Sequence, residues 1–235
     1  MLFLKRKHGL KNGDTEVDQL SERLVTITNP GGMAAEAYRT LRTSLLYTRV
    51  DTPPKVVAIT SPGPRDGKST VCANLGVVLA HADQRTLIMD SDLRNPVLHK
   101  IFELRNNFGV VDVLVGERSL QEVWHEPVAG LKVLTAGRIP PNPAELLSSK
   151  RYAAFVEATR AEFDYVLINT PPIEIASDSA IIASSSDGAV LVLDAQGTRK
   201  YAVQRSIHSL EAVGATVLGT VMNNVKSSYN LDQVY

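Results

Sequence analysis

Two polar segments with the residue types of phosphate chemistry lie close together in the sequence. The first, Gly67-Lys68-Ser69-Thr70, follows the apolar run Val56–Thr60 and precedes a second apolar stretch. The second, Asp90-Ser91-Asp92-Leu93-Arg94, ends another apolar run that begins near residue 85. Together these segments predict nucleotide-dependent phosphoryl chemistry at a single site.

The first segment has the side chains that a phosphate-binding loop needs. Gly67 permits unusual backbone dihedrals and a close approach of the main chain to the ligand. Lys68 can place its ammonium against the β and γ phosphates, and Ser69 can offer its hydroxyl to Mg²⁺. The N-terminus of the helix expected after the loop also favours an anion. The predicted nucleotide-binding residues are Gly63, Pro64, Arg65, Asp66, Gly67, Lys68, Ser69 and Thr70.

The loop departs from the strict pattern for such motifs. That pattern has glycine six residues before the lysine, where this chain has Pro62, and Gly63 follows one place late. The alternative is an ordinary Gly/Pro turn that happens to contain these residues. The flanking strand and helix favour the phosphate-binding loop, because that motif requires them.

The second segment offers two carboxylates at the end of a strand. A spacing of two along an extended chain places Asp90 and Asp92 on the same side, at the edge where open α/β sheets bind ligands. We expect Asp90 to accept a proton from an attacking hydroxyl and Asp92 to help hold a metal ion. Arg94 would neutralise charge or fix a carboxylate. The alternative is a solvated Asp/Arg turn, which the nearby lysine loop disfavours.

These segments together resemble the bacterial tyrosine kinases (BY-kinases) of capsule and exopolysaccharide loci. The lysine loop matches their Walker A motif, and three apolar residues followed by Asp-x-Asp-x-Arg match their Walker A′ motif. The stretch 165–172 occupies the Walker B place, and residues 136–147 are also similar to the family. Glu36, Arg39 and Arg42 match the Glu-x-x-Arg-x-x-Arg oligomerisation motif. The resemblance covers about residues 20–225.

The resemblance implies a P-loop NTPase fold, ATP and Mg²⁺ as cofactors, and tyrosine autophosphorylation in trans within an oligomeric ring. Ser69, Asp92 and Asn169 would hold the metal ion. Asn223 resembles the asparagine that related ATPases place near adenine, although an ordinary turn asparagine is the alternative. The resemblance further implies a transmembrane activator of the polysaccharide co-polymerase type, a cognate tyrosine phosphatase, and a cytoplasmic location at the inner face of the cell membrane through that partner.

Four departures from the family keep other functions open. Arg65 replaces the first glycine of the usual Pro-Gly-x-Gly-Lys, and Asn169 replaces the Walker B aspartate, although a neutral amide binds Mg²⁺ less strongly than a carboxylate. The tail offers only Tyr229 and Tyr235 where the family has a dense tyrosine cluster, and no segment is long enough to span a membrane.

Two alternatives therefore remain beside the kinase. One is a nucleotide-binding scaffold with weakened kinase activity, which Asn169 favours. The other is a nucleotide-switch ATPase of the partition and positioning type. That class carries a signature lysine five residues before the loop lysine, where this chain has Gly63.

Two further sets of residues have an ordinary alternative reading. Glu36, Arg39 and Arg42 on a helix would be a solvated face with an internal ion pair, unless the family motif makes them an oligomer interface. Tyr229 and Tyr235 are candidate phosphoacceptors in a tail without a packed pattern, or simply two exposed tyrosines.

Composition indicates one globular domain. The chain has 235 residues, of which 44% are apolar and 21% charged, so it can bury one sizeable core. Its formal net charge is zero, which gives no support to a nucleic-acid partner, and its single cysteine excludes an internal disulfide. We expect a basic N-terminal tail at 1–20, a kinase domain at 21–225 and a tyrosine-containing tail at 226–235.

Alternating apolar segments predict the fold class: α/β, with a mostly parallel sheet flanked by helices on both faces. Strands are expected at Val56–Thr60, Thr86–Asp90, 131–135, Tyr165–Asn169, 189–194 and 216–222. Helices are expected at 33–47, 68–82, 144–160, 177–184 and 199–212.

Overall fold

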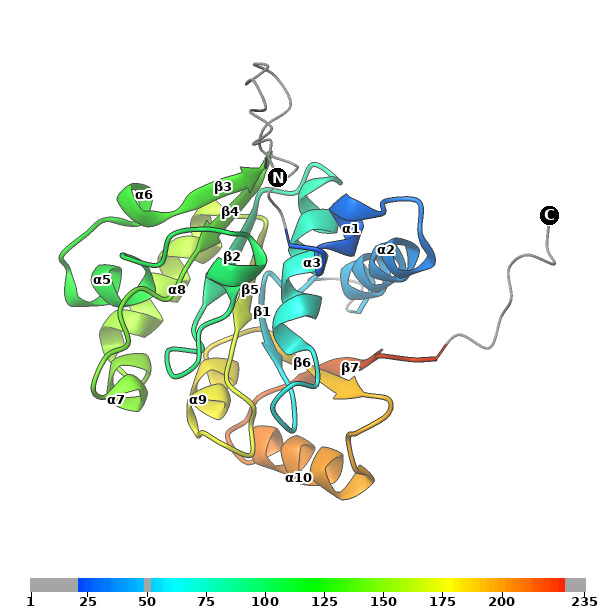
Figure 1. Cartoon of the computed structure of the whole chain (residues 1–235). Helices are drawn as coiled ribbons and strands as arrows, with labels where there is room; N and C mark the ends of the chain where they lie inside the picture. Colours follow the sequence, from blue (N-terminus) through cyan, green and yellow to red (C-terminus); the bar gives the residue numbers. More distant parts are fainter. Residues whose placement is uncertain (1–20, 49–51, 227–235) are drawn as a thin grey trace, which may run out of the picture.

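The computed structural model describes residues 21–48 and 52–226, which form a seven-stranded sheet with helices on both faces (Figure 1). The strand order is β3-β4-β2-β5-β1-β6-β7, and only the pairing of β3 with β4 is antiparallel. The strands are β1 (Val56–Thr60), β2 (Thr86–Asp90), β3 (His125–Val128), β4 (Leu131–Leu134), β5 (Tyr165–Asn169), β6 (Gly188–Asp194) and β7 (Val217–Asn223). The expected fold class is confirmed.

The three central strands are buried along their whole length, which is why they read as continuous apolar runs. Successive side chains of a strand point to opposite faces of the sheet. In β1, Val57 and Ile59 join the core under α3, whereas Val56 and Ala58 join the core on the other face. The sheet therefore has a hydrophobic core on each face, and both cores belong to one domain.

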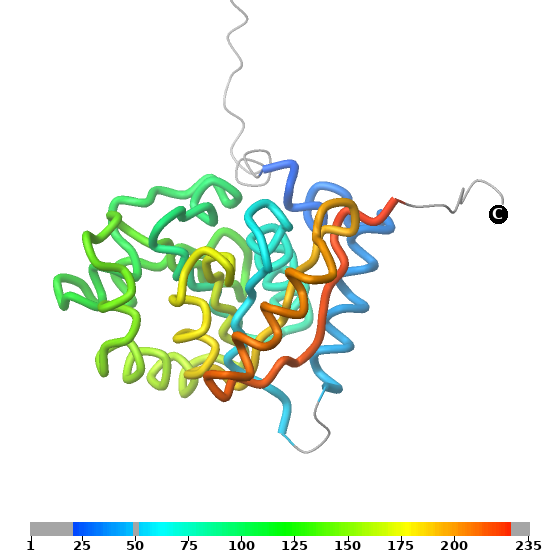
Figure 2. Tube along the Cα trace, turned by 90° about the horizontal axis from the view of Figure 1, so that it is seen from below, coloured from blue at the N-terminus to red at the C-terminus, as the bar shows by residue number. Residues whose placement is uncertain are grey.

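Helices α1 (Val25–Thr28), α2 (Met33–Leu46), α3 (Lys68–Ala80) and α4 (Leu98–Ile101) cover the first face. The second face is covered by α5 (Val110–Val115), α6 (Leu120–Val123), α7 (Pro143–Leu147), α8 (Lys150–Glu162), α9 (Asp178–Ser184) and α10 (Lys200–Glu211). Helix α3 is buried along nearly its whole length between the sheet and α2. Figure 2 shows α2 beside the edge strand β7, and residues of both line a hollow of about 80 Å³.

One expected element is wrong, and five observed elements were not expected, namely the edge strand β3 and the short helices α1, α4, α5 and α6. The helix expected at 144–160 is two helices, α7 and α8, because the chain breaks at Ser148 and Ser149. Ser149 takes an extended conformation, and its Oγ accepts a hydrogen bond from the Tyr152 amide at 3.1 Å, which starts α8. The edge strand β3 was not expected, and its sequence His-Glu-Pro-Val explains why.

Three loops meet at one edge of the sheet. Strands β2, β5 and β1 are neighbours and run parallel, so their carboxyl ends lie side by side. The loops that follow them are 61–67, 91–97 and 170–177. In the described part of the chain, no helix is both long and apolar enough to cross a membrane. The tail 1–20 and the candidate phosphoacceptors Tyr229 and Tyr235 lie outside the described residues.

Candidate functional site

Glycine is required at position 67 by both conformation and space. Gly67 has φ 101°, in the left-handed region, and directly precedes α3. A Cβ at this position would lie 1.9 Å from Nδ2 of Asn223. That same amide donates a hydrogen bond to the Asp66 carbonyl at 3.1 Å. The predicted adenine neighbour Asn223 thus contacts the loop itself, at the end of β7.

Arg65 adopts a backbone conformation that glycine would favour. Its φ is 69°, so this side chain occupies the left-handed region at the position where the BY-kinase pattern has glycine. The loop is held from within: the Gly63 amide donates to Asp66 Oδ2 at 2.9 Å, and Ser61 Oγ donates to the Gly63 carbonyl at 2.7 Å. Burial raises the pKa of Asp66. Arg65 therefore adds backbone strain to a loop that these internal hydrogen bonds hold.

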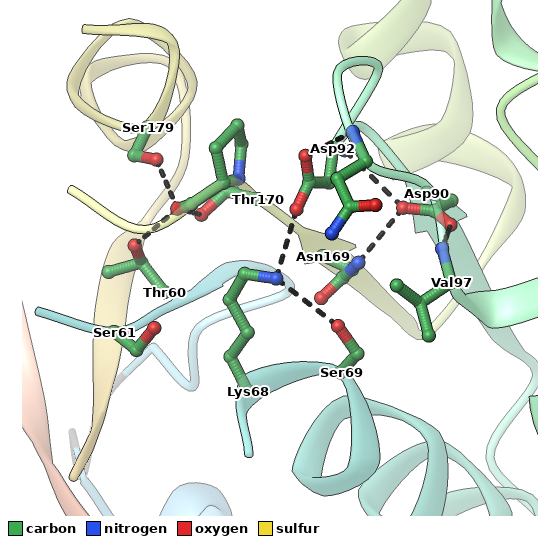
Figure 3. Close-up of polar contacts among 12 residues, drawn as sticks. Thr60, Ser61, Lys68, Ser69, Asp90, Asp92, Val97, Asn169, Thr170 and Ser179 are labelled. Atoms are coloured by element: carbon green, nitrogen blue, oxygen red, sulfur yellow. Dashed lines mark hydrogen bonds and ion pairs between the residues drawn. The ribbon is translucent and has the colours of Figure 1, made fainter. Parts of the chain in front are cut away.

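Lys68 meets Ser69 and Asp92 at the start of α3 (Figure 3). Its Nζ lies 3.0 Å from Asp92 Oδ2 and 3.3 Å from Ser69 Oγ. Lys68 is 9% exposed and Asp92 is 2% exposed, so little water screens this ion pair. The Asn95 amide donates to the other oxygen of Asp92 at 3.1 Å. The structure thus brings together three predicted residues from two separate segments.

Asp90 is fully buried, and four donors surround its carboxylate. Oδ1 accepts from Asn169 Nδ2 at 2.9 Å and from the Asp92 amide at 3.3 Å. Oδ2 accepts from the amides of Val97 and Leu98, each at 3.0 Å. Burial raises the pKa of Asp90 to about 6, and Asp92 adds to the rise, while the hydrogen bonds oppose it. These four donors fill the accepting capacity of a carboxylate.

Asn169 has one polar atom to spare. Its Nδ2 points to Asp90, whereas its Oδ1 is buried and has no hydrogen-bond partner. Figure 3 shows this oxygen on the side of Lys68 and Ser69. A buried unsatisfied oxygen beside a hydroxyl and the Asp92 carboxylate fits Mg²⁺ or its water shell, since Mg²⁺ prefers oxygen ligands and uses one or two carboxylates together with phosphates. Among the described residues, no three or more His, Cys, Asp or Glu side chains are grouped to hold a metal ion by themselves.

Arg94 fixes a carboxylate that the sequence reasoning missed. Its Nε donates to Asp178 Oδ2 at 2.8 Å, and a terminal nitrogen donates to Oδ1 at 3.3 Å. Asp178 is fully buried at the first position of α9. No sequence pattern pairs residues so far apart, and an aspartate between two serines reads as a helix start. The catalytic role predicted for Arg94 stays a prediction.

The oligomerisation residues lie on α2 and contact each other and α3. Arg39 pairs with Glu36 at 2.6 Å, and both side chains are exposed. Arg42 donates to the Val78 carbonyl at 2.9 Å, so this guanidinium has a partner within the chain. The assignment of these three residues to an oligomer interface remains a prediction.

A family model, a relative in sequence and a solved structure each match most of this chain. A family model described as "ParA: NUBPL iron-transfer P-loop NTPase" matches residues 53–231. The tyrosine-protein kinase YwqD of Bacillus subtilis (strain 168) is 38% identical over 218 residues, which are 92% of this chain and 92% of the relative. The solved structure of the chimerical protein CapA2B2 has a TM-score of 0.83 and 33% identity, and the match covers 89% of this chain and 92% of that one.

The solved structure of the kinase domain of the Escherichia coli tyrosine kinase ETK is also similar to this chain. Its TM-score is 0.81 with 32% identity, and the match covers 88% of this chain and 83% of that chain. A match of this length includes the lysine loop, both aspartates and the strand that ends in Asn169. The chain therefore belongs to the bacterial tyrosine kinases, a family with the P-loop NTPase fold.

Proposed function

We propose that this chain is an ATP- and Mg²⁺-dependent protein tyrosine kinase that phosphorylates tyrosines of neighbouring copies of itself. The observation that carries the proposal is the meeting of Lys68, Ser69 and Asp92, with Nζ of Lys68 within 3.3 Å of both partners. The Asp90–Asn169 pair lies beside them, on adjacent strands. A lysine, a hydroxyl and carboxylates around one loop are the parts that phosphoryl transfer needs.

Each residue then has a role in binding. Lys68 and the amides of the loop hold the phosphates, because they supply positive charge and N–H donors at a helix N-terminus. Ser69, Asp92 and the free Oδ1 of Asn169 would hold Mg²⁺. When bound, the metal ion neutralises charge that develops on the phosphates. Asn223, whose amide contacts the loop at Asp66, is the residue that we propose lies near adenine.

Asp90 is the proposed base for the acceptor hydroxyl. A pKa near 6 suits a base that works at neutral pH. Its four hydrogen-bond donors leave no lone pair for an incoming proton, so one donor must withdraw first. The amides of Asp92, Val97 and Leu98 belong to the backbone between β2 and the start of α4, whereas the Asn169 amide is a side chain and can rotate. Release of Asp90 by Asn169 is therefore part of the proposed mechanism.

Membership of the family supports a proposal for the biological setting. Tyr229 and Tyr235 are the proposed acceptors, and Glu36, Arg39 and Arg42 contribute to a ring of copies. A transmembrane partner of the polysaccharide co-polymerase type would recruit and activate the chain at the inner face of the cell membrane, and a cognate tyrosine phosphatase would reverse the reaction. Capsule or exopolysaccharide synthesis and export is the proposed process.

An assay with γ-labelled ATP tests the kinase against its two alternatives. Label on tyrosine supports the kinase, release of phosphate alone supports a switch ATPase, and neither supports a nucleotide-binding scaffold. Full autophosphorylation by Asp90→Ala would remove the proposed base. Mass spectrometry that finds phosphate elsewhere but never on Tyr229 or Tyr235 would overturn the acceptor assignment.

Light scattering tests the ring. We expect Arg39→Ala/Arg42→Ala to reduce the oligomer, because these are the basic groups of the motif. Arg85→Ala is the matched control, since it removes an exposed arginine that also pairs with a carboxylate within the chain. A parental oligomer in the double variant would exclude the interface.

A further inference from the structure

We infer that Asp178 is a positioning residue, which acts through Arg94 to hold the Asp92 carboxylate in place for Mg²⁺. The two residues form a bidentate ion pair, with contacts of 2.8 and 3.3 Å. Within the described residues, this is the only ion pair that connects the loop after β2 with the segment from residue 170 to the end of α9. The inference rests on the proposed use of Mg²⁺ and adds a residue outside the predicted site.

The Asp178 end of the ion pair lies in the core. Asp178 is fully buried, and its neighbour Ser179 donates from Oγ to the Pro171 carbonyl. Thr60, at the end of β1, donates to the same carbonyl at 3.0 Å (Figure 3). The start of α9 is thus tied to two central strands through Pro171, and a carboxylate at this position has little freedom to move.

The other end lies within the segment that carries Asp92. Arg94 is two residues beyond Asp92 and directly precedes Asn95, whose amide donates to Asp92 Oδ1 at 3.1 Å. The remaining oxygen, Oδ2, faces Lys68 at 3.0 Å. When Lys68 turns to a phosphate, the Asn95 amide still directs the carboxylate. Arg94 fixes the backbone of this turn, and so fixes the direction of Asp92.

Arginine is needed at position 94 because its contact with Asp178 is planar and uses two donors. A guanidinium offers two parallel donors to the two oxygens of Asp178, whereas lysine offers a point charge on a flexible stem. Substitutions that disturb the groups behind a metal ligand typically lower metal affinity by about 10- to 100-fold. We therefore expect the Arg94–Asp178 pair to affect Mg²⁺ more than the nucleotide itself.

The test measures Mg²⁺ dependence of binding with a fluorescent ADP analogue and no tyrosine acceptor. In Arg94→Lys and Asp178→Asn, we expect the half-saturating Mg²⁺ concentration to rise about tenfold, with metal-free binding of the analogue unchanged. The double variant should be no worse than the single ones, because either change breaks the same pair. Arg85→Lys and Asp164→Asn are the matched controls, since they alter another bidentate pair, which joins the starts of β2 and β5. The controls should stay within about twofold of wild type.

A second measurement needs no ligand at all. Amide hydrogen exchange at Asn95 should accelerate in Arg94→Lys, because the turn that holds this amide against Asp92 loosens. The Arg94 side chain is 46% exposed, so this variant keeps the test decisive even where Asp178→Asn fails to fold. Unchanged Mg²⁺ dependence in folded Arg94→Lys, an equal shift in the controls, or additive effects in the double variant would each overturn the inference. A wild-type chain that binds Mg-ADP but phosphorylates no tyrosine would instead refute the proposed function alone.

Discussion

Replacing Asn169 by aspartate turns a hydrogen-bonded pair of buried side chains into two facing carboxylates. In the wild type, Asn169 Nδ2 donates to Asp90 Oδ1 at 2.9 Å, and both residues are fully buried. At this distance and an effective dielectric constant of about 20, two unit charges repel by roughly 6 kcal/mol. A pair of this kind avoids the repulsion by taking up a proton and sharing it.

The cost of that proton sets the loss of stability. Holding a carboxyl protonated costs about 1.4 kcal/mol for each pH unit above its ordinary pKa of about 3.9, which gives about 5 kcal/mol at pH 7.5. The hydrogen bond between the acid and the remaining carboxylate returns about 2 kcal/mol. We therefore expect Asn169→Asp to lower the free energy of unfolding by about 3 kcal/mol, or Tm by roughly 6 to 12 °C for a chain of this size.

The deficit should depend on pH and on Mg²⁺. The shared proton means that the pKa of one carboxyl is raised in the folded state, so the folded state binds more protons and stability falls as pH rises. At pH 6 the deficit should shrink to about 1 kcal/mol by the same arithmetic. Mg²⁺ with ADP should also reduce it, because the cation replaces the proton. Tyrosine phosphorylation should increase, since a carboxylate binds Mg²⁺ better than an amide.

Urea unfolding at pH 6.0 and 7.5, in EDTA and with Mg-ADP, measures each of these effects. Asn74→Asp is the matched control, because Asn74 is also a fully buried amide, which donates to the carbonyls of Arg23 and Thr70. It should lose stability without recovery in Mg²⁺. If Asn169→Asp were as stable as wild type at pH 7.5 without metal, or if its deficit were equal at both pH values, the reasoning would be refuted.

Three other substitutions test the site from different sides. Lys68→Met should abolish binding of a fluorescent nucleotide and lower the free energy of unfolding by about 3 kcal/mol, since it leaves Asp92 buried without its counter-charge; unchanged stability in urea would contradict this. Because the pKa of Asp90 is raised to about 6, the free energy of unfolding of the wild type should decline by up to about 3 kcal/mol from pH 4 to pH 6. Asp90→Asn should remove most of that decline. If the free energies of unfolding of wild type and Asp90→Asn fell in parallel over this pH range, the result would count against the raised pKa. Arg65→Gly should leave stability unchanged or raise it by up to about 1 kcal/mol, because the strain at φ 69° is relieved while the unfolded chain gains freedom. Arg151→Gly, at the exposed second position of α8, should lose up to about 1 kcal/mol in the same urea unfolding assay, and an equal loss in both variants would disprove the strain at Arg65.

The elements that could be predicted from the sequence are those whose burial follows one simple rule. Strands β1, β2 and β5 are central in a parallel sheet, so they appear as unbroken apolar runs with sharp ends, and their expected bounds are those observed. Strand β3 lies at the edge, where a proline and charged side chains are tolerated, and nothing in its sequence indicates a strand. The break between α7 and α8 depends on a single serine cap within an otherwise helical stretch.

The residues of the candidate site also divide into those that could be predicted from the sequence and those that could not. Lys68, Ser69 and Asp92 were predictable because each lies in a local motif that ends a strand or starts a helix. Asp178 was not, because only the three-dimensional path of the chain brings it to Arg94. The four partners of Asp90 were also out of reach, since three are backbone amides and the fourth depends on the rotamer of Asn169.

We expect the ion pair between Lys68 and Asp92 to make the loop selective among anions. A free sulfate or inorganic phosphate that attracts Lys68 leaves Asp92 stranded in a poorly hydrated position, so the gain on one side is offset by a loss on the other. A polyphosphate that arrives with its own divalent cation satisfies both residues in one exchange of partners. We therefore expect the resting arrangement of these two side chains to discriminate against the abundant simple anions of the cell.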